Sequence, residues 1–486
     1  MEQLVTPLLA SPDRDFASSP THVRLSEVLA GLSYALDLTE GQRPGHAVRT
    51  CAIGMRIGEI LGLDRQQRSA LFYALLMKDL GCSSNASRFA ALFAAHDHRL
   101  KADLKTVNWS DALESFRFVA RNVAPGGFWL RRVWWTLAVL LRGPKGASEV
   151  VETRCERGAD IARLLGFTED TVQAIRTLDE HWDGRGQPYA VKGPDIPLLG
   201  RIVGLAQTVE VFFSTYGVMT AYDMAFARRG TWFDPEIVDA LLSIRTDAAF
   251  WQWLGVGDQL TAIASVEPAD CLIVADDDYL DLVAEAFARV IDAKSPWTYR
   301  HSNGVAEISV GIANAFSFAP HEVRDLRRAA LLHDLGKLGI SSLILDKPAK
   351  LTDAEFAIVR RHPEHTTEIL SRVGCFRHLA DVAGSHHERL DGKGYHRGLP
   401  AASLTKAARV ICTADICDAL RATRPYRPGL STGRVLDVMQ REVGTGIDAD
   451  CYAAVRTVLS ELVPFQDEVT AVKTVATLAE DYHQAA

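Results

Sequence analysis

The stretch LLHDLGK, residues 331–337, places His333 beside Asp334 within a predicted helix, with Lys337 one turn later. Imidazole and carboxylate groups in such pairs are common ligands of divalent cations. Further groups of this kind are His301, His362 in RRHPEH, His386 and His387 in HHERLDGKGYH, and Asp415 in TADICDA. Because these donors come from several separate segments, the sequence predicts that they converge on one metal centre.

One residue pattern occurs twice along the chain. The two copies align at four pairs of positions: His46 with His301, Asp79 with Asp334, Asp183 with Asp391, and Gln207 with Asp415. The first two pairs are 255 positions apart and the last two are 208 apart, so the first copy carries 47 additional residues before about Cys155. A repeat of this length predicts two related domains rather than a solenoid of short units.

Both copies are predicted to be helical. Segments such as AVRTCAIGMRIGEIL and SNGVAEISVGIANAF carry apolar residues at helical spacing. Thr352 followed by Glu355 is typical of a capping box at a helix start. Strand-like alternation is confined to short runs such as DCLIVAD. The sequence therefore predicts an all-α fold of two related helical domains in tandem, residues 20–265 and 270–486, with a helical insertion at about residues 85–150.

Size, charge and cysteine usage narrow the class of protein. A chain of 486 residues is long enough for two or three domains, and its net charge of −8 disfavours nucleic-acid binding over a broad basic face. The eight cysteines are scattered without a CxxC pair, which fits a reducing compartment. The N-terminus lacks the basic start of a signal peptide, and no apolar run approaches the roughly 18 residues of a spanning helix. We therefore expect a cytoplasmic protein without a transmembrane segment.

The motif order of the second copy, HD, GK, HP, HHE, DGxGY and a late Asp, resembles the HD-GYP branch of the HD phosphohydrolase superfamily over most of residues 280–465. The resemblance implies an all-helical fold and two divalent cations per site, bridged by Asp334. It implies seven metal ligands: His301, His333, Asp334, His362, His386, His387 and Asp415. Mixed nitrogen and oxygen sites accept Fe, Mn, Zn or Ni, and we expect Fe or Mn before Zn or Ni.

The same resemblance implies an enzyme, a metal-dependent phosphodiesterase whose substrate is cyclic di-GMP. A hydroxide held between the two metals would attack phosphorus in line, with Asp334 and Lys337 as the catalytic residues and Lys337 contacting the substrate phosphate. Tyr395, Arg424 and Tyr426 are expected to contact the nucleotide, the last two on its guanine side.

The second copy departs from the family pattern at three positions. His396 stands where the GYP motif has its proline. Trp297 occupies the position where some members place an extra glutamate ligand, which favours two metals over three. His365 follows HPE where the family commonly has glycine, and we expect an exposed helix residue there rather than an additional ligand.

The first copy has lost most of the predicted ligands. Lys78 aligns with His333, Cys155 with His362, Leu178 and Asp179 with the paired histidines, and Gln207 with Asp415. Only His46 and Asp79 remain, and Lys78 is expected to form a salt bridge with Asp79. This predicts a catalytically inactive domain that serves regulation, dimerisation or ligand sensing, through which a homodimer or a signalling partner could form.

Two alternatives to the leading function stay open. The chain could be a phosphomonoesterase or nucleotidase acting on another small phosphate ester, because HD metal sites serve many substrates. It could also be a nucleotide-sensing scaffold without turnover. The aromatic insertion, with Phe128, Trp129, Trp134 and Trp135, is interpreted as a buried helix or a subunit contact in preference to a membrane-surface helix.

Overall fold

The computed structural model describes residues 23–109, 111–125, 128–256, 259–296, 298, 300–423 and 428–461. Within these residues the only strands are β1 (Val23–Arg24) and β2 (Val274–Ala275), which pair in antiparallel fashion. All other regular elements are helices, so the prediction of an all-α fold is confirmed. In the described part of the chain, no helix is both long and apolar enough to cross a bilayer.

The described residues of the first half form fifteen helical elements. They are α1 (Leu25–Thr39), α2 (His46–Ile60), α3 (Arg65–Met77), η1 (Cys82–Asn85), α4 (Ala86–Phe93), α5 (Asp97–Leu104), α6 (Ala112–Asn122), α7 (Trp129–Leu164), α8 (Glu169–Arg176), η2 (Gly193–Asp195), α9 (Leu198–Tyr216), α10 (Val218–Ala227), α11 (Pro235–Ser243), α12 (Ala248–Val256) and α13 (Gln259–Val266).

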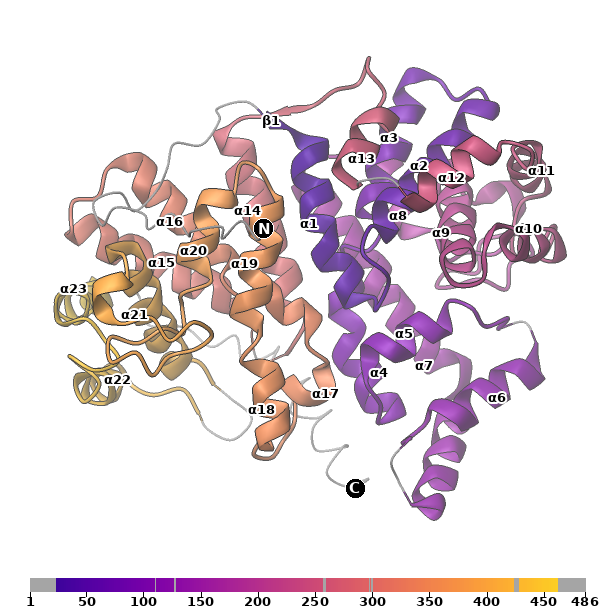
Figure 1. Ribbon diagram of the computed structural model, residues 1–486. Coiled ribbons are helices and arrows are strands. Elements are labelled where there is room, and N and C mark those ends of the chain that lie inside the picture. Colours follow the sequence, from indigo (N-terminus) through magenta and orange to yellow (C-terminus); the bar gives the residue numbers. More distant parts are fainter. Residues whose placement is uncertain are drawn as a thin grey trace, which may run out of the picture.

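The second half begins after β2. Its elements are α14 (Asp277–Asp292), α15 (His301–Ala315), α16 (Pro320–Leu332), η3 (Leu335–Gly339), α17 (Ser342–Leu345), α18 (Asp353–Val359), α19 (His362–Arg372), η4 (Arg377–Leu379), α20 (Ala380–Ala383), η5 (Ala401–Ser403), α21 (Lys406–Arg421), α22 (Thr432–Gln440) and α23 (Ala449–Glu461). Figure 1 shows the two halves side by side.

Helix α1 joins the two halves. It is apolar nearly all round, with Leu25, Leu29 and Leu32 fully buried, so it must pack on more than one side. It contacts α2, α3 and α13 of the first half, and η3 and α19 of the second; Figure 1 shows it between the two sets of helices. Gly31 permits this approach, because a Cβ there would lie 2.7 Å from a methyl carbon of Val373. One apolar core therefore runs through both halves.

Local predictions around the motifs hold only in part. Thr352 and Glu355 form the predicted capping box of α18. However, α16 ends at Leu332, so Lys337 lies in the short helix η3 and not one turn further along the same helix. The sequence DICDALR predicts a helix that begins at Asp415, but Asp415 lies in the interior of α21, because the preceding KAARVICTA is helical as well.

The region predicted as an insertion contains α4, α5, α6 and the first part of α7. It has a small apolar core of its own, which includes Phe93, Phe118 and Trp135. The other aromatic residues at the start of α7 are not part of this core: Phe128 is 69% exposed and Trp129 is 62% exposed. The interpretation as a buried helix is therefore wrong for both residues, and the alternative of a subunit contact stays a prediction.

Candidate metal centre

All seven side chains predicted as metal ligands lie together in one centre of the second half. They are His301 at the start of α15, His333 and Asp334 at the end of α16, His362 at the start of α19, His386 and His387 in the turn after α20, and Asp415 in α21. Three groups bring all their ligand atoms within 4.8 Å of one another: His301, His333 and Asp415; His333, Asp334 and His386; and His362, His386 and His387. The prediction that these residues converge agrees with this geometry.

Asp334 occupies the middle of the centre and presents each carboxylate oxygen to two imidazoles. Its Oδ1 lies 3.3 Å from Nε2 of His362 and 3.6 Å from Nε2 of His386. Its Oδ2 lies 3.3 Å from Nε2 of His333 and 3.6 Å from Nε2 of His301. A carboxylate placed in this way can bridge two cations, because each oxygen shares its space with a different pair of nitrogen donors.

Asp415 and Lys337 flank this carboxylate. Oδ1 of Asp415 lies 3.3 Å from Nε2 of His301, and its Oδ2 lies 3.5 Å from Nδ1 of His387. Nζ of Lys337 lies 2.5 Å from Oδ2 of Asp334, and the lysine side chain is partly exposed. Lys337 therefore contacts the buried carboxylate of Asp334 from the more exposed side of the centre.

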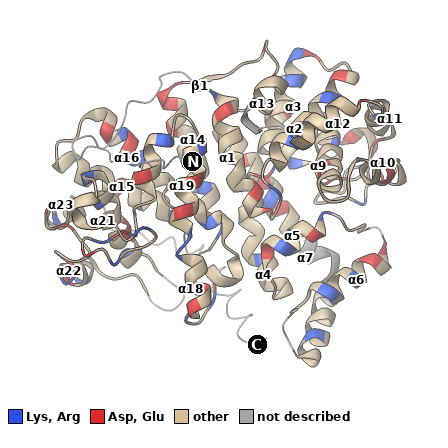
Figure 2. Cartoon of the chain, in the orientation of Figure 1, with Lys and Arg blue, Asp and Glu red and all other residues tan. Residues whose placement is uncertain are grey.

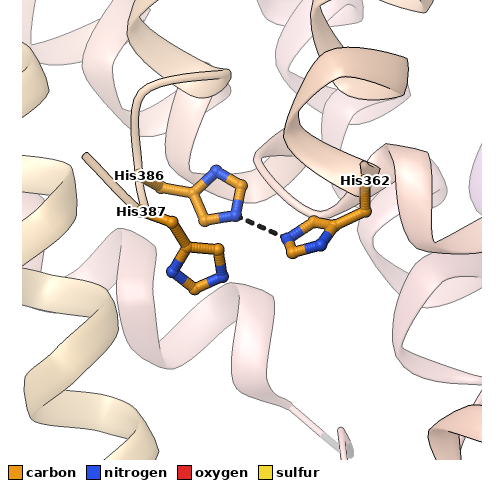
Figure 3. Close-up of side chains that lie close together, drawn as sticks. All are labelled: His362, His386 and His387. Atoms are coloured by element: carbon orange, nitrogen blue, oxygen red, sulfur yellow. Dashed lines mark hydrogen bonds between the residues drawn. The ribbon is translucent and has the colours of Figure 1, made fainter. Parts of the chain in front are cut away.

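Hydrogen bonds fix the orientation of three imidazoles. In His333, His362 and His386, Nδ1 donates to the carbonyl oxygen three residues earlier, at 2.7, 2.7 and 2.6 Å. Because a carbonyl only accepts, Nδ1 carries the hydrogen and Nε2 keeps its lone pair directed at the centre. Figure 3 shows Nε2 of His362 and of His386 facing each other, 2.9 Å apart. A cation at this point would relieve the repulsion between the two lone pairs.

Burial sets the protonation states that metal binding requires. It lowers the pKa of His386 well below the usual value and that of His387 to about 3, so both rings are neutral near pH 7. Burial alone would raise the pKa of Asp334, but His333 and Lys337 hold it well below its usual value. Neutral imidazoles and ionised carboxylates are the forms that coordinate metal ions.

Two buried polar atoms in the centre lack any hydrogen-bond partner, namely Nε2 of His333 and Oδ1 of Asp334. Leaving such atoms unpaired is costly, so they indicate an absent ligand. His301 differs, since burial would lower its pKa but Asp415 and Asp418 outweigh burial and raise it to about 10. A cation at Nε2 of His301 would displace that proton. The donor set therefore fits divalent metal ions.

The residues predicted to contact substrate are only partly described. Tyr395 is half-buried, and its ring packs against that of His387 with centroids 4.7 Å apart and an interplanar angle of 39°. Arg424 and Tyr426 lie outside the described residues, as does Trp297. Tyr395 is thus an aromatic surface beside the centre, on which a nucleobase could stack.

His365 and His396, the other departures from the family pattern, are both half-buried. His365 was expected to be an exposed helix residue, but it lies beside Gly339 at the end of η3. Neither histidine belongs to a group of converging ligand atoms within the described ranges.

One further residue, Asp418, contacts a predicted ligand, although the sequence favours only a hydrogen-bonding role within its helix. Asp418 accepts a hydrogen bond from Nδ1 of His301 at 2.6 Å, which turns Nε2 of that ring toward Asp334. The signal was present, because Asp418 follows Asp415 by three residues and so shares its side of a helix. Glu388 plays a different part: its carboxylate accepts from the backbone N–H groups of Arg397 and Leu399, each at 2.8 Å, and holds the glycine-rich loop.

The first half repeats the outer part of this arrangement. His46 contacts Glu210 through Nδ1, as His301 contacts Asp418 in the second half. Glu210 precedes Asp418 by 208 positions, which is the spacing of the later part of the internal repeat. The support for this histidine has therefore been kept in both copies.

Ammonium groups surround the carboxylate of the first half. Nζ of Lys78 contacts Asp79, and the lysine side chain is fully buried, so the predicted salt bridge is present. Nζ of Lys105 lies 3.8 Å from Asp79 and 2.9 Å from Glu40. Nε2 of His46 lies 3.9 Å from Asp79. The carboxylate that faces four imidazoles in the second half here faces two lysines and one imidazole. Glu40, Asp79 and Cys82 still bring three ligand atoms within 4.8 Å of one another.

Comparisons with known proteins agree with this geometry. A model of the HD domain matches residues 147–237 and 285–451. The 3'3'-cGAMP-specific phosphodiesterase 3 of Vibrio cholerae is 43% identical over 447 residues, which cover 92% of this chain and 96% of that protein. A cyclic di-GMP phosphodiesterase of Pseudomonas aeruginosa is 38% identical over 143 residues, 29% of this chain and 34% of that protein. The crystal structure of a V. cholerae cyclic GMP-AMP-specific phosphodiesterase, V-cGAP3, matches with a TM-score of 0.61 and 37% identity, covering 91% of this chain and 99% of that chain.

Proposed function

This chain belongs to the HD domain family, as its likeness to the HD-GYP branch of the HD phosphohydrolases predicted, and we propose that its centre hydrolyses a phosphodiester bond of a cyclic dinucleotide. Cyclic di-GMP was the substrate expected from the sequence. The relative that matches nearly the whole chain is specific for 3'3'-cGAMP. We therefore propose 3'3'-linked cyclic dinucleotides as the substrate class, with both compounds to be tested.

The observation that carries this proposal is the position of Asp334 between four Nε2 atoms. We propose that Asp334 bridges two cations, Fe or Mn, with His362, His386 and His387 on one side and His301, His333 and Asp415 on the other. When bound, two such cations supply a water of lowered pKa and neutralise charge on the phosphoryl oxygens.

The surrounding residues would position the substrate. Lys337 reaches the centre from its more open side, so its ammonium group can turn from Asp334 to a phosphate oxygen of the substrate. The ring of Tyr395 offers a face for a nucleobase next to His387. We keep Arg424 and Tyr426 as proposed contacts on the guanine side.

We propose that the first domain, residues 20–265, is catalytically inactive and that the catalytic domain spans residues 270–486. Lys78 and Lys105 fill the first centre with positive charge, which supports this assignment. We also propose a cytoplasmic location, which is supported by eight cysteines that form no disulfide bond. A regulatory partner or a second copy of the chain would act through the first domain.

Turnover of defined substrates tests the proposed reaction. Full-length protein, loaded with Mn²⁺ or with Fe²⁺ under anaerobic conditions, is incubated with cyclic di-GMP, 3'3'-cGAMP or para-nitrophenyl phosphate, and products are separated by chromatography. We expect linear dinucleotide or mononucleotides from at least one cyclic dinucleotide. Metal-stripped protein is the control, and it should release neither product.

Two other results would contradict the proposal. Cleavage of the phosphomonoester with both cyclic dinucleotides left intact would identify a phosphomonoesterase. Tight binding of a cyclic dinucleotide without turnover in the metal-loaded protein would identify a nucleotide-sensing scaffold.

Asp418 gives a further test, because it orients His301 without belonging to the proposed ligand set. We expect Asp418→Ala to weaken metal binding by about 10- to 100-fold, the usual effect of losing such a partner. Asp418→Asn keeps an oxygen acceptor for Nδ1 of His301 and should restore most of the affinity. Titration of metal-stripped protein with Mn²⁺ measures both variants. Equal affinity in wild type and Asp418→Ala would contradict this role.

A further inference from the structure

The start of α7 exposes an apolar stripe. Leu130, Val133, Trp134 and Leu137 follow one another at helical spacing, so they share one face of the helix. All four side chains are exposed, whereas the neighbouring Trp135 points the other way into the small core of the insertion. In the described part of the chain, nothing covers this face.

Phe128 and Trp129 extend the stripe at the first turn of α7, and both are more than half exposed. We call these two residues together with Leu130, Val133, Trp134 and Leu137 the α7 patch. Single exposed apolar side chains are ordinary, but a contiguous group of six with three aromatic rings marks an interaction surface. Helix α6, which packs beside α7, adds exposed Leu113 and Phe116. Figure 1 places α6 at the lower right, remote from α21 to α23.

This region is basic within an acidic protein. From Asp111 to Lys145 the sequence holds six basic residues and two acidic ones, while the whole chain has a net charge of −8. Arg117 and Arg121 on α6 are exposed, and no carboxylate of the described residues lies within 4.0 Å of either guanidinium. Figure 2 shows how lysine, arginine and acidic residues are distributed over the helices in this view.

The positive charge of this region distinguishes between two possible partners of the α7 patch, a second copy of the chain and an anionic bilayer. A symmetric pair of chains would bring two copies of the same basic surface together, which is electrostatically unfavourable. An anionic bilayer offers the opposite charge, and tryptophan, phenylalanine and arginine are the residues that settle at its interface. The chain would lie on the bilayer and not cross it, since no described helix is long and apolar enough to span one.

From this surface we propose that the insertion docks the protein onto anionic phospholipid membranes. The α7 patch enters the headgroup region, and Arg117 and Arg121 contact lipid phosphates. The docking is independent of the proposed reaction, so it can be tested whether or not the protein hydrolyses cyclic dinucleotides.

Vesicle flotation tests the docking. Full-length protein is mixed with vesicles of phosphatidylcholine alone or with about a third phosphatidylglycerol, and the fraction that floats is measured. We expect at least about tenfold more protein with the anionic vesicles, and a decrease at high salt because screening weakens surface charge attraction. Leu130→Glu/Trp134→Glu should abolish flotation. Phe226→Glu is the matched control, because Phe226 is 65% exposed on α10, outside the patch.

Folding of both variants is checked by circular dichroism and thermal melting. Absence of flotation with anionic vesicles would overturn the proposal, and so would flotation that Leu130→Glu/Trp134→Glu leaves unchanged. A dimer in light scattering that the same double substitution dissociates would assign the patch to a subunit contact. Flotation that appears only after removal of residues 462–486 would show that the chain's own end covers the patch, and would also overturn docking of the full chain.

Discussion

We expect His333→Ala/Asp334→Ala to bind no divalent cation and to lose its phosphodiesterase activity. Asp334 offers an oxygen to each of the two proposed cations, and His333 offers a nitrogen to one of them. The double substitution should therefore prevent metal binding at both cation positions. Loss of an outer partner of a ligand costs about 10- to 100-fold, and removal of two inner ligands should cost more than that. Metal content by mass spectrometry and turnover of 3'3'-cGAMP are the measurements.

The first half supplies the matched control, because His46→Ala/Asp79→Ala removes the two aligned ligand types there. We expect its metal content per folded chain to equal that of the wild type. The change leaves Lys78 without its buried partner, so a lower melting temperature is expected in this variant and is measured separately. Metal retained after the His333 and Asp334 substitutions would contradict the proposed centre. Metal lost only with the His46 and Asp79 substitutions would move it to the first half.

The residues of the proposed metal centre could be selected from the sequence because each donor lies in a short local motif. A pair such as His386 and His387 before a glycine-rich turn is visible without any knowledge of the fold. The secondary structure around it was harder. Asp415 lies in the interior of α21, which is buried along most of its length, so the residues before Asp415 show no one-sided helical pattern in the sequence.

Contacts between distant segments could not be predicted. The exposure of Trp134 and the burial of Trp135 depend on which side of α7 faces α6, and the aromatic composition of the segment is the same in either case. The packing of α1 against the second half is another contact of this kind. The apolar sequence of α1 predicts that the helix is buried, but it does not identify the helices that bury it. Polar contacts between the halves, such as those of Asp97, are even less visible in the sequence.

Asp97 of the first half binds two segments next to residues of the proposed centre, Lys337 and His301. Its Oδ1 accepts hydrogen bonds from Oγ of Ser341 at 2.7 Å and from the backbone N–H of Ser342 at 3.0 Å. Its Oδ2 accepts from Nζ of Lys294 at 2.9 Å, and both charged side chains are buried. Ser341 follows Lys337 closely in sequence, and Lys294 precedes the start of α15.

We expect Asp97→Ala to destabilise the protein by about 3–5 kcal/mol, because it leaves the ammonium group of Lys294 buried without its carboxylate partner. The carboxylate of Asp97 would also no longer connect Lys294 with Ser341, so the two segments would be held less firmly. We therefore expect kcat/KM for the cyclic dinucleotide to fall in chains that remain folded. Chemical unfolding and turnover below the melting transition measure the two effects. A surface ion pair gives the control: Glu169→Ala removes the exposed partner of Arg163 and should change neither quantity measurably.

A second substitution separates the charge from the hydrogen bonds. Asp97→Asn keeps an oxygen that can accept from Ser341 and Ser342, and Lys294→Met removes the ammonium group but retains much of its apolar volume. We expect the double variant Asp97→Asn/Lys294→Met to regain most of the stability that Asp97→Ala loses. A double-mutant cycle should then give a coupling free energy between positions 97 and 294. If the double variant were stable but its kcat/KM remained low, the buried charge pair itself would be needed to position the segments next to Lys337 and His301. Wild-type stability and turnover in Asp97→Ala would instead show that this contact between the halves has no part in either.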